Sequence, residues 1–258
     1  MTVQPKIEED TQRSTISPRA IRGILFDLDG TLADTAPDLA RTLNILLAEN
    51  GRPSLPFEQI RPVVSHGATA LLRLGFNHDS ADPAFELLRQ RFLDVYRINL
   101  ANETRLFPGM PELLNAIEQH GMKWGIVTNK PAWLTEPLIA RLQLQHRAAC
   151  IVSGDSTSNR KPHPEPMLHA CQKIDILAGQ CLYVGDAQRD IEAGHRAGMK
   201  TLVALFGYLS KDDRPREWQA DGMINHPMEI LEWIMKYNDP SPHNTPPLPS
   251  LGEGQGEG

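Results

Sequence analysis

The chain has 258 residues, of which 40% are hydrophobic and 22% are charged, and its formal net charge is -6. This length suits one large domain or a domain with an insertion, and the negative balance argues against non-specific binding to nucleic acid or to anionic membranes. No apolar run reaches the roughly 18 residues of a membrane span, and residues 8–10 are acidic where a signal peptide would be apolar. We therefore expect a cytoplasmic protein with a small-molecule partner, and we predict no oligomeric state.

The first predicted strand ends in two carboxylates. Residues 1–19 are polar and aperiodic, so we expect a disordered leader before the apolar run at 24–26. Asp27 and Asp29 should leave the strand on the same side, while Gly30 permits a sharp turn and Thr31 adds a hydroxyl. Carboxylates that converge in this way imply a divalent cation between them or a proton on one of them, and either arrangement suits phosphoryl chemistry. Taken without the rest of the chain, residues 27–31 could also form an ordinary turn after a strand.

An all-helical segment is predicted between residues 37 and 105. Its first helix shows an apolar stripe that ends before Gly51, shorter helices are expected near 57–64 and 68–74, and a longer one begins near Pro83. The apolar positions that define the first and last of these helices are Leu39, Leu43, Leu46, Leu47, Phe85, Leu88, Phe92 and Val95. An insertion at this point can cover the two carboxylates as a lid.

Strands and helices alternate from residue 106 to residue 237. The predicted strands cover 124–127, 149–153, 181–184, 201–205 and 222–224, and the predicted helices run through 111–119, 134–142, 167–171, 191–197 and 228–235. This alternation predicts a doubly wound α/β fold with a parallel sheet. Residues 238–258 are rich in Pro, Gly and Ser, which predicts a disordered tail. The cysteines, Cys150, Cys171 and Cys181, are odd in number and lack metal-site spacing, so we expect them in the core.

Polar motifs follow several of these strands. Residues 128–130 (Thr-Asn-Lys), Lys161 with Pro162, and Gly185 with Asp186 each come after an apolar run. Ligands of doubly wound sheets bind beyond the carboxyl ends of the strands. The sequence therefore predicts one site at this edge of the sheet.

Taken in order with residues 27–31 and Asp190, these motifs resemble the four motifs of the haloacid dehalogenase-like hydrolases, over about residues 22–235. The resemblance implies a Rossmann-like core formed by 20–36 and 106–237, with a helical cap formed by 37–105. This is the arrangement of the phosphoglycolate phosphatase and β-phosphoglucomutase group. The helical segment falls where that cap is expected.

The resemblance also implies roles for the acidic residues. Asp27 would be the nucleophile that forms an aspartyl phosphate, and Asp29 would be the general acid and base. Dehalogenases of the superfamily lack an acid at this position, so Asp29 favours a phosphate ester. Asp27, the backbone carbonyl of Asp29, and Asp186 would bind Mg²⁺, with Asp190 supporting that site. Asp190 could instead only stabilise a helix N-terminus.

The remaining motif residues would contact the phosphoryl group. Thr128 and Asn129 would donate hydrogen bonds to it and Lys161 would offset its charge, although singly they could be a helix cap and a solvated lysine. His66, in a turn of the helical segment, and Lys130 and Arg189, beside the motifs, are further candidates for substrate contacts, together with Arg61 and Arg73.

Several stretches narrow the resemblance further. Residues 109–114, 127–131, 189–191, 207–208 and 218–221 look most like the N-acetylmuramic acid 6-phosphate phosphatases of cell-wall recycling. The alternative is a 2-phosphoglycolate phosphatase. More distant alternatives are a sugar phosphomutase, which needs the same residues, and a phospho-receiver signalling domain, which also places Asp, Thr and Lys together.

Overall fold

A parallel six-stranded sheet forms the centre of the computed structural model, which describes residues 20–77 and 83–238. Across the sheet the strands are β5 (Cys150–Val152), β4 (Lys123–Val127), β1 (Gly23–Phe26), β6 (Cys181–Gly185), β7 (Lys200–Ala204) and β8 (Gly222–Ile224). Every neighbouring pair of these strands is parallel. The doubly wound α/β prediction is therefore confirmed. β1 lies between β4 and β6, where the chain changes direction across the sheet, and this is the usual ligand-binding point of such folds.

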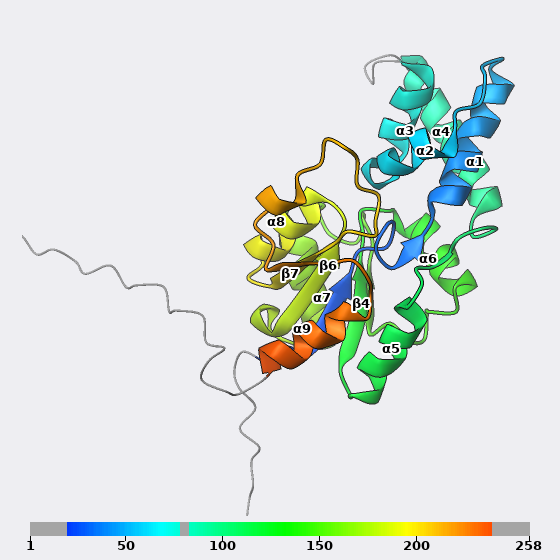
Figure 1. The fold of residues 1–258 in the computed structure, drawn as a ribbon. Coiled ribbons are helices and arrows are strands. Elements are labelled where there is room, and N and C mark those ends of the chain that lie inside the picture. Colours follow the sequence, from blue (N-terminus) through cyan, green and yellow to red (C-terminus); the bar gives the residue numbers. More distant parts are fainter. Residues whose placement is uncertain (1–19, 78–82, 239–258) are drawn as a thin grey trace, which may run out of the picture.

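Helices cover both faces of the sheet (Figure 1). They are α5 (Met110–Gln119), α6 (Ala132–Arg141), α7 (Glu165–Ile174), α8 (Gln188–Arg196) and α9 (Glu229–Asn238), with short 3-10 turns η2 (Ala178–Gln180) and η3 (Pro215–Glu217). The side chains of β1 alternate between two apolar clusters. Ile24 and Phe26 pack in the larger cluster, and Leu25 packs in the cluster that contains α7. Each of the three is fully buried, which stabilises the fold by about 1.5–3 kcal/mol per side chain.

A separate helical layer lies over one end of the sheet (Figure 1). It consists of α1 (Ala36–Glu49), α2 (Phe57–Ile60), the 3-10 helix η1 (Arg61–His66), α3 (Gly67–Phe76) and α4 (Pro83–Asn99). The stripe predicted for the first helix is buried at all four leucines. The helix expected at 57–64 is instead a short α-turn followed by η1, in which Pro62 stands at an early position where no helical N–H is required.

Two short strands join the helical layer to the sheet. β2 (Ala33–Asp34) and β3 (Arg105–Leu106) pair antiparallel, and the sequence did not predict this ribbon. Asp38 fastens the same junction: its fully buried carboxylate accepts hydrogen bonds from the backbone N–H of Glu103 (3.0 Å) and Thr104 (2.9 Å) and from the Thr104 hydroxyl (2.7 Å). The two connections to the layer are thereby held together.

The described chain ends in α9, which packs back on the start of β1. Asn238, placed in the tail by the sequence, is the last residue of this helix, and its amide exchanges two hydrogen bonds with the backbone of Ile21 (2.8 and 3.2 Å). The predicted leader and residues 239–258 of the predicted tail lie outside the described residues. All three cysteines are buried, as expected. Within the described residues, no helix is long and apolar enough to cross a membrane.

Candidate active site

Asp27 lies directly after β1 and is almost fully buried, with 3% exposure. Its backbone N–H donates to the carbonyl of Val184 in β6, which continues the sheet and fixes the residue between two strands. The turn that follows needs Gly30, because its φ of +87° is left-handed and a Cβ there would collide with the carboxylate of Asp186. The sequence-predicted turn thus brings Asp27 and Asp186 together.

The ammonium of Lys161 is buried between two carboxylates. Its Nζ lies 2.8 Å from Oδ1 of Asp27 and 2.7 Å from Oδ1 of Asp190, and the lysine side chain has no exposed surface. The Tyr183 hydroxyl (2.8 Å) and the Val127 carbonyl (2.9 Å) complete its surroundings. Burial raises the pKa of Asp27, and Lys161 opposes that rise by favouring the carboxylate. Lys161 therefore holds Asp27 in place and partly offsets its charge.

Asn129 positions Lys161. Its side-chain amide donates to the backbone carbonyl of Lys161 (3.0 Å), and its Oδ1 accepts from the backbone N–H of Lys161 (3.0 Å). The side chain of Asn129 thus holds the backbone of Lys161, and the expectation that Asn129 donates to a phosphoryl oxygen stays a prediction. Thr128, which is also buried, lines the cavity, and its hydroxyl accepts a hydrogen bond from the backbone N–H of Lys130 (3.2 Å).

Asp29 is paired with a lysine of its own. Nζ of Lys130 lies 2.9 and 3.2 Å from the two carboxylate oxygens of Asp29, and the Thr35 hydroxyl donates to Oδ1 at 2.6 Å. The same ammonium lies 4.8 Å from the ring centre of Tyr96 in α4. Burial alone would lower the pKa of Lys130, but Asp29 raises it above its usual value.

This pairing bears on two expectations. Each of the carboxylates of Asp27 and Asp29 has its own lysine partner, Lys161 and Lys130. Lys130, a candidate for contact with a substrate, is here paired with Asp29. The Thr31 hydroxyl, expected to join the carboxylates, is fully buried and has no hydrogen-bond partner among the described residues.

Three acidic side chains form a compact group beneath the cavity. Ligand oxygens of Asp27, Asp186 and Asp190 all lie within 4.8 Å of one another. Asp186 directs Oδ2 toward the Ser65 hydroxyl (2.6 Å) and the backbone N–H of Tyr208 (2.9 Å), whereas its buried Oδ1 has no hydrogen-bond partner among the described residues. Burial, followed by the charges of Asp27 and Asp190, raises the pKa of Asp186 to about 7.

This donor set fits magnesium. Mg²⁺ prefers oxygen ligands and binds through a few carboxylates, and the unpaired oxygen of Asp186 beside Asp27 is such a donor. Asp190 is different because Lys161 engages its Oδ1 and the Ala187 N–H donates to its Oδ2 (3.1 Å). Both of its oxygens are thus engaged by the protein, and its expected role in supporting the metal site stays a prediction.

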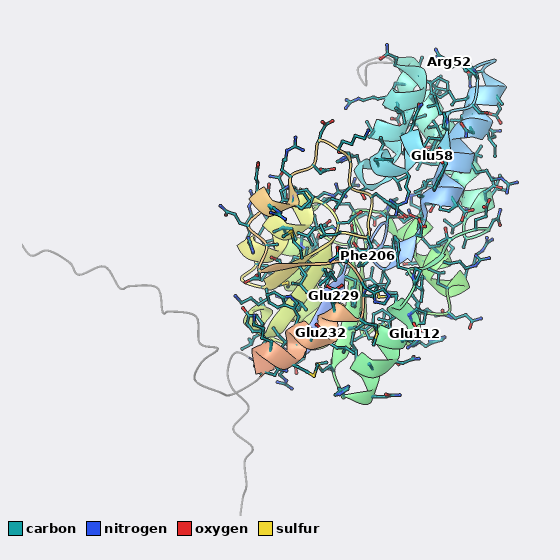
Figure 2. The ribbon with its side chains drawn as sticks, in the orientation of Figure 1. Arg52, Glu58, Glu112, Phe206, Glu229 and Glu232 are labelled. Carbon is teal, nitrogen blue, oxygen red and sulfur yellow. The ribbon has the colours of Figure 1, made fainter. Side chains whose placement is uncertain are left out.

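The 3-10 helix η1 reaches down from the helical layer onto the sheet. Arg61 donates to the backbone carbonyls of Phe206 (3.1 Å) and Gly207 (3.0 Å), and Phe206 is labelled in Figure 2 between the two parts of the molecule. Arg189 of α8 donates to the carbonyl of Ser65 (2.6 Å). His66 has an exposed side chain, and partial desolvation together with the charge of Arg189 lowers its pKa. These contacts hold η1 over the acidic group.

A cavity of about 630 Å³ lies between η1, α4 and the sheet. Its lining includes most of the residues expected from the sequence, namely Asp27, Asp29, His66, Thr128, Asn129, Lys130 and Arg189. Arg61 and Arg73 do not line it; Arg61 holds the loop at Phe206, and Arg73 is exposed on α3. Among the lining residues that the sequence did not single out are Ser65, Tyr96, Trp133 and Arg160. Only Arg160 could have been suspected from the sequence, because it directly precedes the motif residue Lys161.

Comparison with known proteins now identifies the family. The family model described as haloacid dehalogenase-like hydrolase matches residues 24–204. This chain belongs to the haloacid dehalogenase-like hydrolases. This confirms the resemblance that was inferred from the motifs. It also excludes the alternative of a phospho-receiver signalling domain.

Two relatives and one solved structure are similar to this chain over most of its length. It is 46% identical over 211 residues to a phosphoglycolate phosphatase of Xanthomonas campestris pv. campestris, covering 82% of this chain and 95% of the relative. It is 42% identical over 214 residues to an N-acetylmuramic acid 6-phosphate phosphatase of Pseudomonas putida, covering 83% and 96%. A crystal structure of a predicted phosphoglycolate phosphatase from Haemophilus somnus 129pt superposes with a TM-score of 0.74 at 29% identity, covering 83% of this chain and 97% of that one.

Proposed function

We propose that this hydrolase is a magnesium-dependent phosphomonoesterase that works through an aspartyl phosphate on Asp27. The observation that supports this most directly is the ion pair between Asp27 and the fully buried Lys161, at the floor of a cavity large enough for a small metabolite. A carboxylate held in this way is a nucleophile that needs no separate base. Relatives that cover most of the chain are named phosphatases.

Magnesium would be held by Asp27, Asp186 and the backbone carbonyl of Asp29. When bound, it would supply positive charge that offsets the repulsion between these carboxylates and an anionic phosphate ester. Asp190 and Lys161 would keep Asp27 oriented. Thr128 and the backbone N–H of Asn129 would donate to the phosphoryl oxygens.

The chemistry of the chain's own residues can be written in two steps. A carboxylate oxygen of Asp27 attacks phosphorus, the bond from phosphorus to the ester oxygen breaks, and Asp29 gives its proton to the departing alkoxide. Asp29 then takes a proton from water as the water oxygen attacks phosphorus. The bond between phosphorus and Asp27 breaks, which releases phosphate and restores the carboxylate.

We further propose the helical layer, residues 37–105, as a cap domain whose boundary is the β2–β3 ribbon. Its residues Ser65, His66 and Tyr96 line the cavity or contact the acids below it. A cap in this position would exclude water from the phosphoryl group while leaving room for the remainder of the substrate.

For the substrate we propose N-acetylmuramic acid 6-phosphate, with a role in cell-wall recycling in the cytoplasm. A cavity of about 630 Å³ offers space for a sugar ring beyond the phosphoryl group, whereas phosphoglycolate would fill little of it. A relative at 42% identity carries this substrate in its name. 2-Phosphoglycolate, which the name of the relative at 46% identity indicates, is the second candidate.

The test is a panel of phosphorylated metabolites assayed for released phosphate, with magnesium and with a chelator. We expect magnesium-dependent release, with the highest kcat/KM for N-acetylmuramic acid 6-phosphate. A higher kcat/KM for phosphoglycolate would refute the substrate while leaving the phosphatase proposal standing. Conversion of a hexose 1-phosphate to its isomer, without net phosphate release, would show a phosphomutase instead.

A further inference from the structure

The cavity contains a cationic side chain that the proposed chemistry does not use. Five side chains that line the cavity carry nitrogen groups able to bear positive charge: His66, Arg89, Lys130, Arg160 and Arg189. Three of them already have polar partners, and the fourth, His66, has a lowered pKa. Arg160 differs from the others, and its surroundings indicate a second binding site within the same cavity.

The four side chains other than Arg160 can be taken in turn. Lys130 is paired with Asp29, and Arg89 makes two hydrogen bonds to the carboxylate of Glu86 (2.8 and 2.7 Å). Arg189 is largely buried and bound to the carbonyl of Ser65, and nearby acids raise its pKa. His66 has a lowered pKa, which favours its neutral form. Three of these four side chains thus already have polar partners, which leaves them less available than Arg160 to a substrate.

Arg160 lies on the loop between β5 and α7, directly before Lys161. Its Nε donates to the backbone carbonyl of Gly154 (2.8 Å), whose own N–H donates to the carbonyl of Lys130 (2.8 Å). One nitrogen of the guanidinium is thus held by the loop after β5, which is itself bonded to Lys130, next to Thr128 and Asn129. Among the described residues, no carboxylate lies within ion-pair distance of it. The two nearest acids in sequence have other partners: Asp155 accepts from the backbone N–H of Ala132 (2.8 Å) and Glu165 from that of Asn159 (2.9 Å).

An aromatic side chain lines the same cavity. Trp133, near the start of α6, is 40% exposed despite its size, and it lines the cavity together with Arg160. An indole face accepts the apolar C–H surface of a sugar ring, and a guanidinium with free terminal nitrogens binds a carboxylate through two parallel hydrogen bonds. A phosphate alone would need neither group.

We propose that Arg160 and Trp133 form a remote subsite that binds the carboxylate and ring of a carboxylated sugar phosphate while its phosphoryl group lies at Asp27. This inference rests on the proposed phosphatase function and extends it by assigning a specificity residue. The lactyl carboxylate of N-acetylmuramic acid 6-phosphate is a ligand of this class. Arg160 would then be its partner, in place of the candidates suggested by the sequence, which were Lys130, Arg189, Arg61 and Arg73.

The test compares two substrates that differ only in the lactyl group, N-acetylmuramic acid 6-phosphate and N-acetylglucosamine 6-phosphate. The readout is the ratio of their kcat/KM values, because any effect transmitted through the adjacent Lys161 would change both substrates alike and leave the ratio unaltered. We expect the wild-type ratio to favour the carboxylated sugar by about ten- to a hundredfold, the range of a charge-assisted bidentate contact. Arg160→Gln should bring the ratio close to one, and Arg160→Lys should retain part of it.

Arg89→Gln is the matched control, because Arg89 lines the same cavity but is already paired with Glu86. Its ratio should remain that of the wild type. Binding of N-acetylmuramic acid 6-phosphate to the Asp27→Asn variant, measured by calorimetry, should weaken by a similar factor when Arg160→Gln is added.

A wild-type ratio near one, or an Arg160→Gln variant that retains the wild-type ratio, would overturn the inference. An aryl phosphate separates this result from failure of the proposed function. If the wild-type enzyme hydrolyses the aryl phosphate but shows no preference for the carboxylated sugar, only the subsite is refuted. If it hydrolyses none of the three esters, the phosphatase proposal itself fails, and the subsite falls with it.

Discussion

Replacing Lys161 by Met should destabilise the fold by an amount set by the two acids it holds. The ammonium lies 2.8 Å from Asp27 and 2.7 Å from Asp190, and the lysine side chain has no exposed surface. Removing one partner of a buried ion pair costs about 3–5 kcal/mol, because the remaining charge is left uncompensated. Total stabilities are commonly about 5–15 kcal/mol, so this loss is a large fraction. With a urea m value of about 2 kcal/mol/M, the unfolding midpoint should fall by about 2 M.

The pH dependence of this loss tests its electrostatic origin. Without Lys161, burial should raise the pKa of Asp27 further above its unfolded value. The folded variant then binds more protons than the unfolded chain, so its stability should rise as pH falls, and the deficit should be larger at pH 8 than at pH 5. Urea unfolding in chelator-containing buffer measures this, with Lys211→Met as an exposed control. If the Lys161→Met curve overlays the Lys211→Met curve at pH 8, the reasoning is refuted.

Three further predictions concern catalysis. Asp27→Asn should abolish turnover in a folded protein because the amide cannot attack phosphorus, and near wild-type phosphate release by that variant would exclude Asp27 as the nucleophile. Asp29→Asn should lower kcat by roughly a hundredfold or more with alkyl phosphates and by less with aryl phosphates, whose leaving groups need little protonation; equal deficits would contradict its role as an acid. Activity should disappear with a chelator, and Asp186→Ala should raise the magnesium concentration for half-maximal activity; an unchanged requirement would remove Asp186 from the proposed ligands.

The sheet and the positions of the acids were predictable because they depend on local pattern. The apolar run before Asp27 is long enough for one buried strand, and Thr128 and Asp186 also directly follow such runs. Since parallel strands present their carboxyl ends at one edge, the meeting of Asp27 and Asp186 follows from the topology, whereas Lys161 comes back to them on a polar loop after β5. The apolar stripe of α1 similarly indicated its buried face.

The pairing of side chains within the site was not predictable in the same way. Nothing local to Lys130 says that its ammonium faces Asp29, since that contact depends on how two loops approach each other across the sheet edge. Asn129 likewise pairs with the backbone of Lys161 only because the loops after β4 and β5 are adjacent. Asp38, which looks like an ordinary acid in the first turn of a helix, is fully buried because the chain returns beside it at Thr104.

The most direct test of the central claim is to detect the covalent intermediate. The Asp29→Asn variant should be mixed with an aryl phosphate and magnesium, quenched in acid, and digested for mass spectrometry. Formation of the intermediate needs little help from Asp29 with such a leaving group, whereas its hydrolysis needs the missing base, so the intermediate should accumulate. The account predicts one phosphoryl group on the peptide that contains Asp27, removable by hydroxylamine. Release of the aryl alcohol with no phosphoryl group on that peptide, or with the group on another residue, would contradict it.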